Sequence, residues 1–139
     1  VAQAALASAR AAAERTVIRA PRDGRILEIL ARPGERLGEN GLAELGRVAR
    51  MYAIAEVYET DVGRVRLGES ATADSAALAT TLTGRVTRIR PKIQKQDELG
   101  TDPAARKDAR VVEVEILLDN PAAVRDLTNL QVEIVIGAR

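Results

Sequence analysis

The sequence APRDGRIL occupies residues 20–27, and the sequence RPGERL follows at residues 32–37. Each stretch contains a dipeptide that favours a tight turn. Asp23-Gly24 is suited to supply the positive φ angles of a two-residue hairpin turn. Pro33-Gly34 is suited to a type II turn, because proline fixes φ and glycine then accepts a positive φ. We therefore predict short strands joined by tight turns, with Asp23, Gly24, Pro33 and Gly34 as structural turn residues.

The segment directly upstream, residues 1–15, predicts a helix. It contains eight alanines and neither glycine nor proline, and alanine is the best helix former. A helix of about 15 residues is only marginally stable alone in water. We expect the segment to continue a longer helix or to pack on a neighbour, and the alternative is a solvated N-terminal helix.

Residues 16–49 have the pattern of short strands separated by turns. The apolar runs are Val17-Ile18, residues 26–30 and residues 42–48, and Asn40-Gly41 adds a third break after the two turn dipeptides. The whole chain of 139 residues is long enough for one domain, or for two small modules that share a boundary.

From Arg50 onward the sequence predicts longer strands. Alternating apolar residues place Val112, Val114, Ile116 and Leu118 on one face of a strand, and Leu130, Val132, Ile134 and Ile136 on one face of another. The alternation in residues 51–58 places Met51, Ala53, Ala55 and Val57 on a common face. The predicted strands are residues 51–58, 69–74, 81–90, 109–119 and 130–137.

Turn signals punctuate these strands. Residues 60–65 predict one helical turn with Thr60 as its N-cap, and Gly68 ends it. Pro91 ends the strand that begins at residue 81, because proline cannot donate to a ladder. Residues 121–127 predict a second helical turn. These strand-like segments, with one helical turn after the first, favour a small closed barrel, which leaves no exposed edges.

Composition excludes several classes of function. The net charge of +1 gives no electrostatic case for binding nucleic acid or a polybasic contact with a membrane surface. Tyr52 and Tyr58 are the only aromatic residues, so stacking platforms for single-stranded nucleic acid are absent from the sequence. The sequence has no Cys and no His, which excludes the usual zinc sites, cysteine nucleophiles and histidine-based triads. No apolar run approaches the roughly 20 residues of a spanning helix.

We expect no catalytic, cofactor-binding or metal-binding residues, and hence no enzyme. Glu113 and Glu115 are two residues apart on a strand, on the face opposite Val114, as expected of a solvated strand face. Glu59 and Asp61 are better suited to capping a helix than to binding a cation. The segment 92–108 predicts a long polar loop of mixed charge, which is either a solvated loop or a partner contact. The candidate contact residues in it are Lys92, Lys95, Arg106 and Lys107.

Several segments together resemble the HlyD-like periplasmic membrane fusion (adaptor) proteins of bacterial export systems. The first is the Ala-rich helix followed by the two turn dipeptides. The second is AEVYETDV at residues 55–62, followed by VRLGE at residues 65–69. DPAA at residues 102–105, DARVVEV at residues 108–114 and LTNLQVEI at residues 127–134 are closest to the DevB-like adaptors, which serve MacB-type ABC exporters.

This resemblance implies a mainly β fold and a structural role. Residues 1–15 would be the end of a coiled-coil hairpin, residues 16–49 the second half of a lipoyl-like (barrel-sandwich) module, and residues 50–139 a small β-barrel domain. The chain would then be a fragment, attached to the inner membrane through a segment that it lacks. The implied partners are an inner-membrane ABC transporter (a MacB-like permease), a TolC-like outer-membrane channel and further copies in a ring, in the periplasm and with no cofactor.

Two other functions remain open from the residues. One is a non-catalytic β-barrel interaction module of an assembly or translation factor. The other is a lipoyl or biotinyl carrier, whose cofactor is attached to a lysine at a hairpin turn. Residues 16–49 contain no lysine, and the only lysines are Lys92, Lys95 and Lys107. The carrier function therefore lacks the residue it needs.

We predict that the chain accepts neither lipoate nor biotin, because the two turns at residues 23–24 and 33–34 offer no lysine. The measurement is intact mass after co-expression with a lipoate ligase or a biotin ligase. Only the unmodified mass is expected, and a mass increase equal to either cofactor would establish a carrier domain instead.

Overall fold

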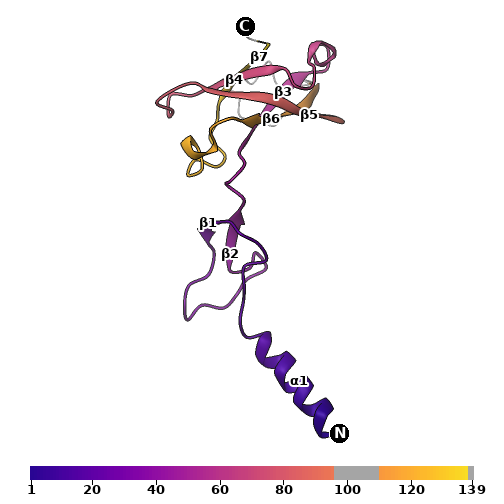
Figure 1. Cartoon of the computed structure of the whole chain (residues 1–139), viewed down its shortest axis with the longest axis vertical. Helices are drawn as coiled ribbons and strands as arrows, with labels where there is room; N and C mark the ends of the chain where they lie inside the picture. The colour runs from indigo at the N-terminus through magenta and orange to yellow at the C-terminus, as the bar shows by residue number, and fades with distance from the viewer. Residues whose placement is uncertain (96–109, 138–139) are drawn as a thin grey trace. The chain divides into compact units, whose positions relative to one another are not determined.

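The structure is a computed structural model that describes residues 1–95 and 110–137. The described chain is mainly β, with one N-terminal helix (Figure 1), as the sequence predicted. It divides into two compact units, Val1–Gly46 and Arg47–Arg139, and each is described separately below.

Helix α1 spans Ala2–Glu14 and confirms the helix predicted at the N-terminus. None of its residues is buried, and Leu6 is half exposed. Its last turn is closed by side chains of the residues that follow. The Arg15 Nε donates to the Ala11 carbonyl at 3.2 Å, and the Thr16 hydroxyl donates to the Ala13 carbonyl at 2.6 Å. The helix is therefore held by alanine propensity and local hydrogen bonds, not by burial.

The first unit contains a single antiparallel pair of strands, β1 (Arg25–Ile29) and β2 (Ala43–Gly46). The long connection between them contains the predicted Pro33-Gly34 turn. Gly34 has φ +91°, and the Glu35 N–H donates to the Arg32 carbonyl at 3.0 Å. The Glu35 carboxylate also accepts from the Arg32 N–H at 2.7 Å. The predicted turn is therefore confirmed. Two hydrogen bonds between its first residue, Arg32, and its fourth, Glu35, close it.

The prediction of a two-residue hairpin turn at Asp23-Gly24 is wrong. Val17 and Ile18 form no strand, so β1 has no preceding partner, and Gly24 does not have a positive φ. The glycine is needed for a different reason. A Cβ at Gly24 would lie 2.8 Å from the Gly46 carbonyl oxygen, so any side chain would collide with the β2 backbone.

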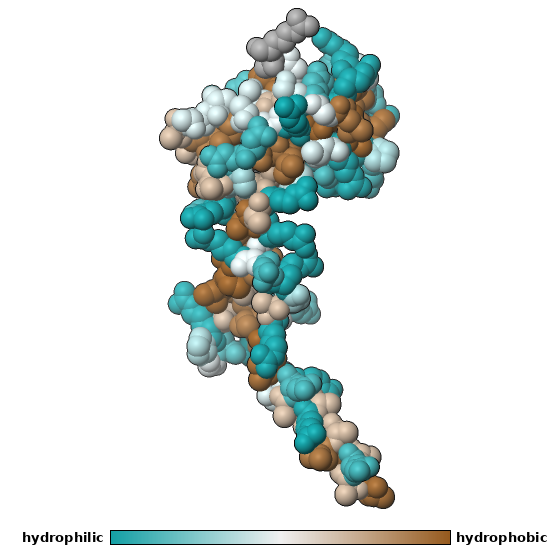
Figure 2. Space-filling view, in the orientation of Figure 1, coloured by the Kyte–Doolittle hydropathy of each residue, from teal (hydrophilic) through white to brown (hydrophobic). Residues whose placement is uncertain are grey.

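Packing in the first unit is sparse. Ala31 is its one buried residue, and Val17, Ile18, Ile26 and Ile29 are all more than half exposed. Figure 2 shows apolar residues in brown at the surface of this unit. Exposed strand edges and apolar faces of this kind are suited to pairing with further chain.

The second unit is one five-stranded antiparallel sheet. Its strand order is β3-β6-β5-β4-β7, and it curves into a nearly closed, barrel-like form (Figure 1). Its five strands correspond to the five predicted ranges, and β3 and β7 are not paired with one another. The predicted complete closure, without exposed edges, is therefore wrong. The strands are β3 (Tyr52–Tyr58), β4 (Ser70–Asp74), β5 (Leu82–Lys95), β6 (Arg110–Leu118) and β7 (Glu133–Ile136).

The core lies on the inner face of this sheet and consists of small aliphatic residues. The face assigned to β6 is confirmed, since Val114 and Ile116 are fully buried, and the alternation in β3 is confirmed by buried Ala53 and Ala55. The β7 face is also as predicted but only half buried. The buried cluster is Ala53, Ala55, Val65, Ala71, Ala73, Leu82, Val86, Val114, Ile116, Leu118 and Val124.

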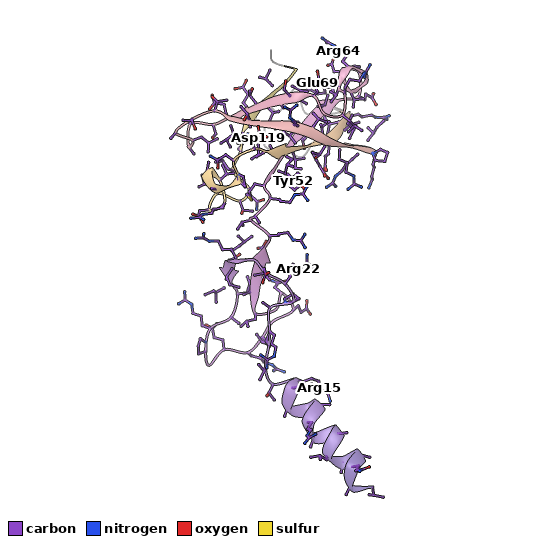
Figure 3. The ribbon with its side chains drawn as sticks, viewed as in Figure 1. Arg15, Arg22, Tyr52, Arg64, Glu69 and Asp119 are labelled. Carbon is purple, nitrogen blue, oxygen red and sulfur yellow. The ribbon has the colours of Figure 1, made fainter. Side chains whose placement is uncertain are left out.

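The connection from β3 to β4 contains a 3₁₀ turn, η1 (Val62–Arg64), whose N-cap is Asp61 and not Thr60. This 3₁₀ helix starts one residue later than the predicted helical turn, and no side chain caps it. Gly68 ends the connection with φ +80°, as predicted, and donates its N–H to the Val86 carbonyl at 2.7 Å. The Glu69 carboxylate accepts from the Arg66 N–H at 2.9 Å (Figure 3).

Strand β5 continues beyond the predicted stop at Pro91 and reaches Lys95. The register of β5 against β6 shifts between Ile89 and Ile93. Such an irregularity accommodates a residue that has no N–H to donate. The predicted loop therefore begins later than residue 92, and residues 96–108 of it lie outside the described residues. The predicted turn after β6 is present as a shorter 3₁₀ helix, η2 (Pro121–Ala123).

We predict that Val114→Asp unfolds the sheet, because it would place an unpaired carboxylate where the wild-type side chain has 0% exposure. The expected loss is about 3 kcal/mol or more of the free energy of unfolding. Urea unfolding followed by circular dichroism measures it. Val135→Asp is the matched control, because Val135 on β7 is 52% exposed, and it should change stability by about 0.5 kcal/mol or less. Equal midpoints for the two variants would contradict the face assignment.

Candidate functional site

The candidate contact residues in the predicted loop fall in different places. Lys92 is exposed on β5, and Lys95 is the last residue of the same strand. Arg106 and Lys107 lie outside the described residues. Lys92 therefore belongs to a strand and not to a loop, although it lies where the register of β5 against β6 shifts.

An ion-pair network covers the outer face of β5 and β6. The Arg90 guanidinium lies 3.1 Å from the Glu113 carboxylate and 3.1 Å from the Glu115 carboxylate, and Arg88 lies 3.9 Å from Glu115. The Thr87 hydroxyl also donates to the Glu115 carbonyl at 3.2 Å. The two glutamates are thus on the solvent-facing side, as predicted, and their carboxylates hold the two strands together.

Like charges meet at both edges of the sheet. Glu56 on β3 is directly opposite Glu113 on β6, and Asp74 on β4 is directly opposite Glu133 on β7. Cross-strand pairs of like charge are destabilising. Arg90 compensates Glu113, whereas Glu56 and Glu133 are exposed. The outer rims of β3 and β7 therefore carry an excess of negative charge.

A cavity of about 810 Å³ lies on the inner side of these two edges. Its volume is in the range of binding pockets, roughly 300–1,000 Å³. The small side chains of Ala53, Ala55 and Ala73 leave much of the space open, and the remaining walls are mostly branched aliphatic. The lining comes from β3, β4, β5 and β6, from Val124 and from residues 129–136. Its apolar members include Met51, Val57, Leu82, Leu118, Leu130, Val132, Ile134 and Ile136, and its polar members include Glu56, Glu113, Asn129 and Gln131. We call this cavity and its two unpaired strand edges the seam.

The sequence analysis missed the seam because it predicted a closed barrel. The alternation correctly assigned Ala53, Ala55, Ile134 and Ile136 to the inner face. Whether two such faces meet across an open or a closed edge depends on strand pairing, which the alternation does not report. The strand predicted over residues 130–137 is present only as the four residues of β7, a shortening that the alternation does not report either.

The seam combines aliphatic walls with polar side chains, because Glu56, Glu113, Asn129 and Gln131 also line it. Across residues 1–93 and 110–137, no charged or polar side chain is buried, and no group of three or more possible ligands is placed to hold a metal ion. The outer side of β3 presents Tyr52, Ile54 and Tyr58 to solvent, and the Arg50 guanidinium lies 5.7 Å from the centroid of the Tyr52 ring (Figure 3). Within the same residues, no helix is both long enough and apolar enough to cross a membrane.

Comparison with known proteins places the fold. No protein-family model matches the chain, and no curated protein matches its sequence. The structure is similar to the crystal structure of ZneB from Cupriavidus metallidurans, with a TM-score of 0.60 and 21% sequence identity. The alignment covers 86% of this chain and 32% of the ZneB chain, so this chain spans about a third of that protein's length. The likeness shows a shared fold.

We predict that Arg90→Met lowers the stability of the sheet, because it removes the guanidinium that pairs with both Glu113 and Glu115. Arg90 is 44% exposed, so the expected loss is small, about 0.5–1 kcal/mol at low salt. The loss should shrink as salt screens the charges. Urea unfolding at low and high ionic strength measures it. Arg85→Met on the same strand is the control and should have little effect at either salt concentration. Equal losses for both variants would show that the network contributes nothing.

Proposed function

We propose that this chain is part of a periplasmic adaptor subunit of a tripartite export system, which couples an inner-membrane transporter to an outer-membrane channel. The observation that carries the proposal is the fold shared with ZneB over 86% of this chain. ZneB is a periplasmic adaptor of the membrane fusion protein family. The role is structural, and it requires no reaction and no cofactor of this chain.

The order of elements supports the same function. A helix comes first, then a small β unit with a Pro-Gly turn, then a barrel-like sheet. We assign residues 1–15 to the end of a helical hairpin, residues 16–49 to half of a lipoyl-like module and residues 50–139 to the β-barrel domain. The sparse packing of the first unit supports the second assignment, because half a sandwich lacks the surface that would cover Ile26 and Ile29.

The sequence segments suggest a finer assignment to the DevB-like adaptors. The partners would then be a MacB-like ABC permease and a TolC-like channel, with several copies of the adaptor in a ring. The location would be the periplasm, with attachment to the inner membrane through a segment outside this chain. Lys92, Lys95, Arg106 and Lys107 are the proposed contacts with the transporter or with a neighbouring subunit, and the exposure of Lys92 supports that assignment.

The test is affinity purification, after cross-linking in cells, of the longest natural polypeptide that contains this chain. We predict co-purification of an inner-membrane ABC permease and an outer-membrane channel. Lys92→Glu should lower the yield of the permease severalfold, because it reverses an exposed charge on β5. Arg64→Glu is the matched control, since Arg64 lies on the exposed turn η1 (Figure 3), and it should leave the yield unchanged.

Two results would count against the proposal. Recovery of ribosomes or assembly factors in place of membrane proteins would favour the interaction-module function. If Lys92→Glu and Arg64→Glu lowered the yield of the permease equally, the adaptor function would stand, but Lys92 would not be part of its contact surface.

A further inference from the structure

A β-bulge in β5 places Arg88 on the outer face of the sheet. On β6 the partners of Val86 and Arg88 are consecutive residues, so Thr87 is an extra residue in β5. Strict alternation from the buried Val86 would have turned Arg88 toward the core. The extra residue reverses the alternation instead, and Thr87 and Arg88 are both exposed. The bulge therefore directs a guanidinium to solvent.

The guanidiniums on this face are exposed, whereas the carboxylates beside them are recessed. The side chain of Arg88 is 66% exposed and that of Glu115 is 18% exposed, and the two groups are 3.9 Å apart. Glu115 is already paired with Arg90 at 3.1 Å, so it neutralises little of the charge of Arg88. Arg85 is exposed and forms no ion pair with a carboxylate of the described residues. Solvent therefore meets positive charge along β5.

An exposed leucine lies beside the same part of β5. The Gly68 N–H donates to the Val86 carbonyl at 2.7 Å, and the Val86 N–H donates to the Glu69 carbonyl at 2.9 Å. These two bonds hold the turn at residues 66–69 next to the bulge. Leu67 in this turn is 67% exposed, and Arg66 is also exposed. We call four of these residues the β5 patch: Arg66, Leu67, Arg85 and Arg88.

The β5 patch is suited to carboxylates and not to a single phosphate. The backbone N–H groups of Gly68 and Val86 already donate to carbonyls, and the Thr87 hydroxyl donates to the Glu115 carbonyl at 3.2 Å. These groups are therefore not available to cradle a phosphate. The arginines offer planar forks instead, and each fork can bind one carboxylate through two parallel hydrogen bonds.

The spacing of the arginines matches that of an extended segment. Arg85 is opposite Leu117, and Arg88 is opposite Glu115, two residues further along β6. Two residues of a strand span about 7 Å, and side chains on one face of any extended segment repeat at that same distance. Acidic residues at positions i and i+2 would therefore reach both guanidiniums. An apolar residue beside this acidic pair would cover Leu67.

We propose that the β5 patch binds an extended acidic segment of a partner protein. The segment has Asp or Glu at two alternate positions and an apolar residue next to them on the same face. Charge complementarity carries this choice of partner. A membrane surface is disfavoured, because one leucine offers little area to insert. Nucleic acid is disfavoured, because the β5 patch has no aromatic side chain on which a base could stack. The inference does not depend on the proposed adaptor function.

The test uses the whole chain and a fluorescent heptapeptide, Leu-Ser-Glu-Ser-Glu-Ser-Leu, with both ends blocked. We expect saturable binding by fluorescence anisotropy at low salt, and weaker binding as salt screens the charges. The matched peptide is Leu-Ser-Ser-Glu-Glu-Ser-Leu, which has the same composition and charge. Its adjacent glutamates point to opposite faces of an extended chain, so it should bind severalfold more weakly.

Variants of the β5 patch locate the site. Arg85→Gln and Arg88→Gln should each weaken binding severalfold, and together by about tenfold at low salt. Leu67→Ser should weaken binding at low and high salt alike, because its contact is apolar. Arg125→Gln is the matched control, since it removes the same charge from a side chain that is 55% exposed outside the patch. It should leave binding within about twofold, and circular dichroism should show an unchanged fold for every variant.

Three results would overturn the proposal. The first is equal binding of the two peptides, which would show attraction by net charge without recognition of spacing. The second is equal weakening by Arg125→Gln and by the double variant of Arg85 and Arg88. The third is an absence of peptide binding together with binding to phosphatidylglycerol vesicles that the double variant abolishes, which would make the patch a contact with anionic lipid.

Discussion

Strand β6 is bonded to β3 on one side and to β5 on the other, and its inward side chains, Val114 and Ile116, are fully buried. These side chains belong to the same buried cluster as the alanines of β3 and β4, and the stability of the second unit depends on that cluster. The approach of β5 to β6 is so close that a Cβ at Gly84 would lie 2.5 Å from the Leu117 carbonyl oxygen. Without aromatic residues in the core, small side chains and close strands supply the packing.

The small size of the core side chains also explains the open seam. Alanine at the inner positions of β3 and β4 fills little volume, and a β7 of four residues cannot follow the whole length of β3. Five strands then surround a cavity that their own side chains do not fill. On the outer face, Arg90 compensates the negative charge of Glu113 and Glu115. Among the described residues, the glutamates on the edge strands β3 and β7 form no such ion pair, so these edges are acidic. The seam therefore combines apolar space with negative charge, because of the alanines inside the sheet and the glutamates on its edge strands.

Local patterns predicted much of this fold. Alternation in residues 112–118 gave the correct inner face, because the side-chain period of a strand is set by its backbone. Pro33-Gly34 and Gly68 gave correct turns, because their φ requirements are local. The errors concern partners that are distant in the sequence. Asp23-Gly24 would have closed a hairpin only if Val17 and Ile18 had formed a strand, and Pro91 was accommodated by a register shift against β6. The seam and its like-charge pairs depend on register, which one sequence does not report.

The two confirmed turns share more than glycine. Arg32-Pro33-Gly34-Glu35 and Arg66-Leu67-Gly68-Glu69 each have a Glu N–H that donates to the Arg carbonyl, and a Glu carboxylate that accepts from the Arg N–H. Each ring closes within four residues, so it costs little loop-closure entropy and needs no tertiary contact. We expect both turns to form within microseconds, well before the slower pairing of strands that are distant in sequence. The same short motif would then reverse the chain early in each unit and reduce the conformations that β1 and β4 must search.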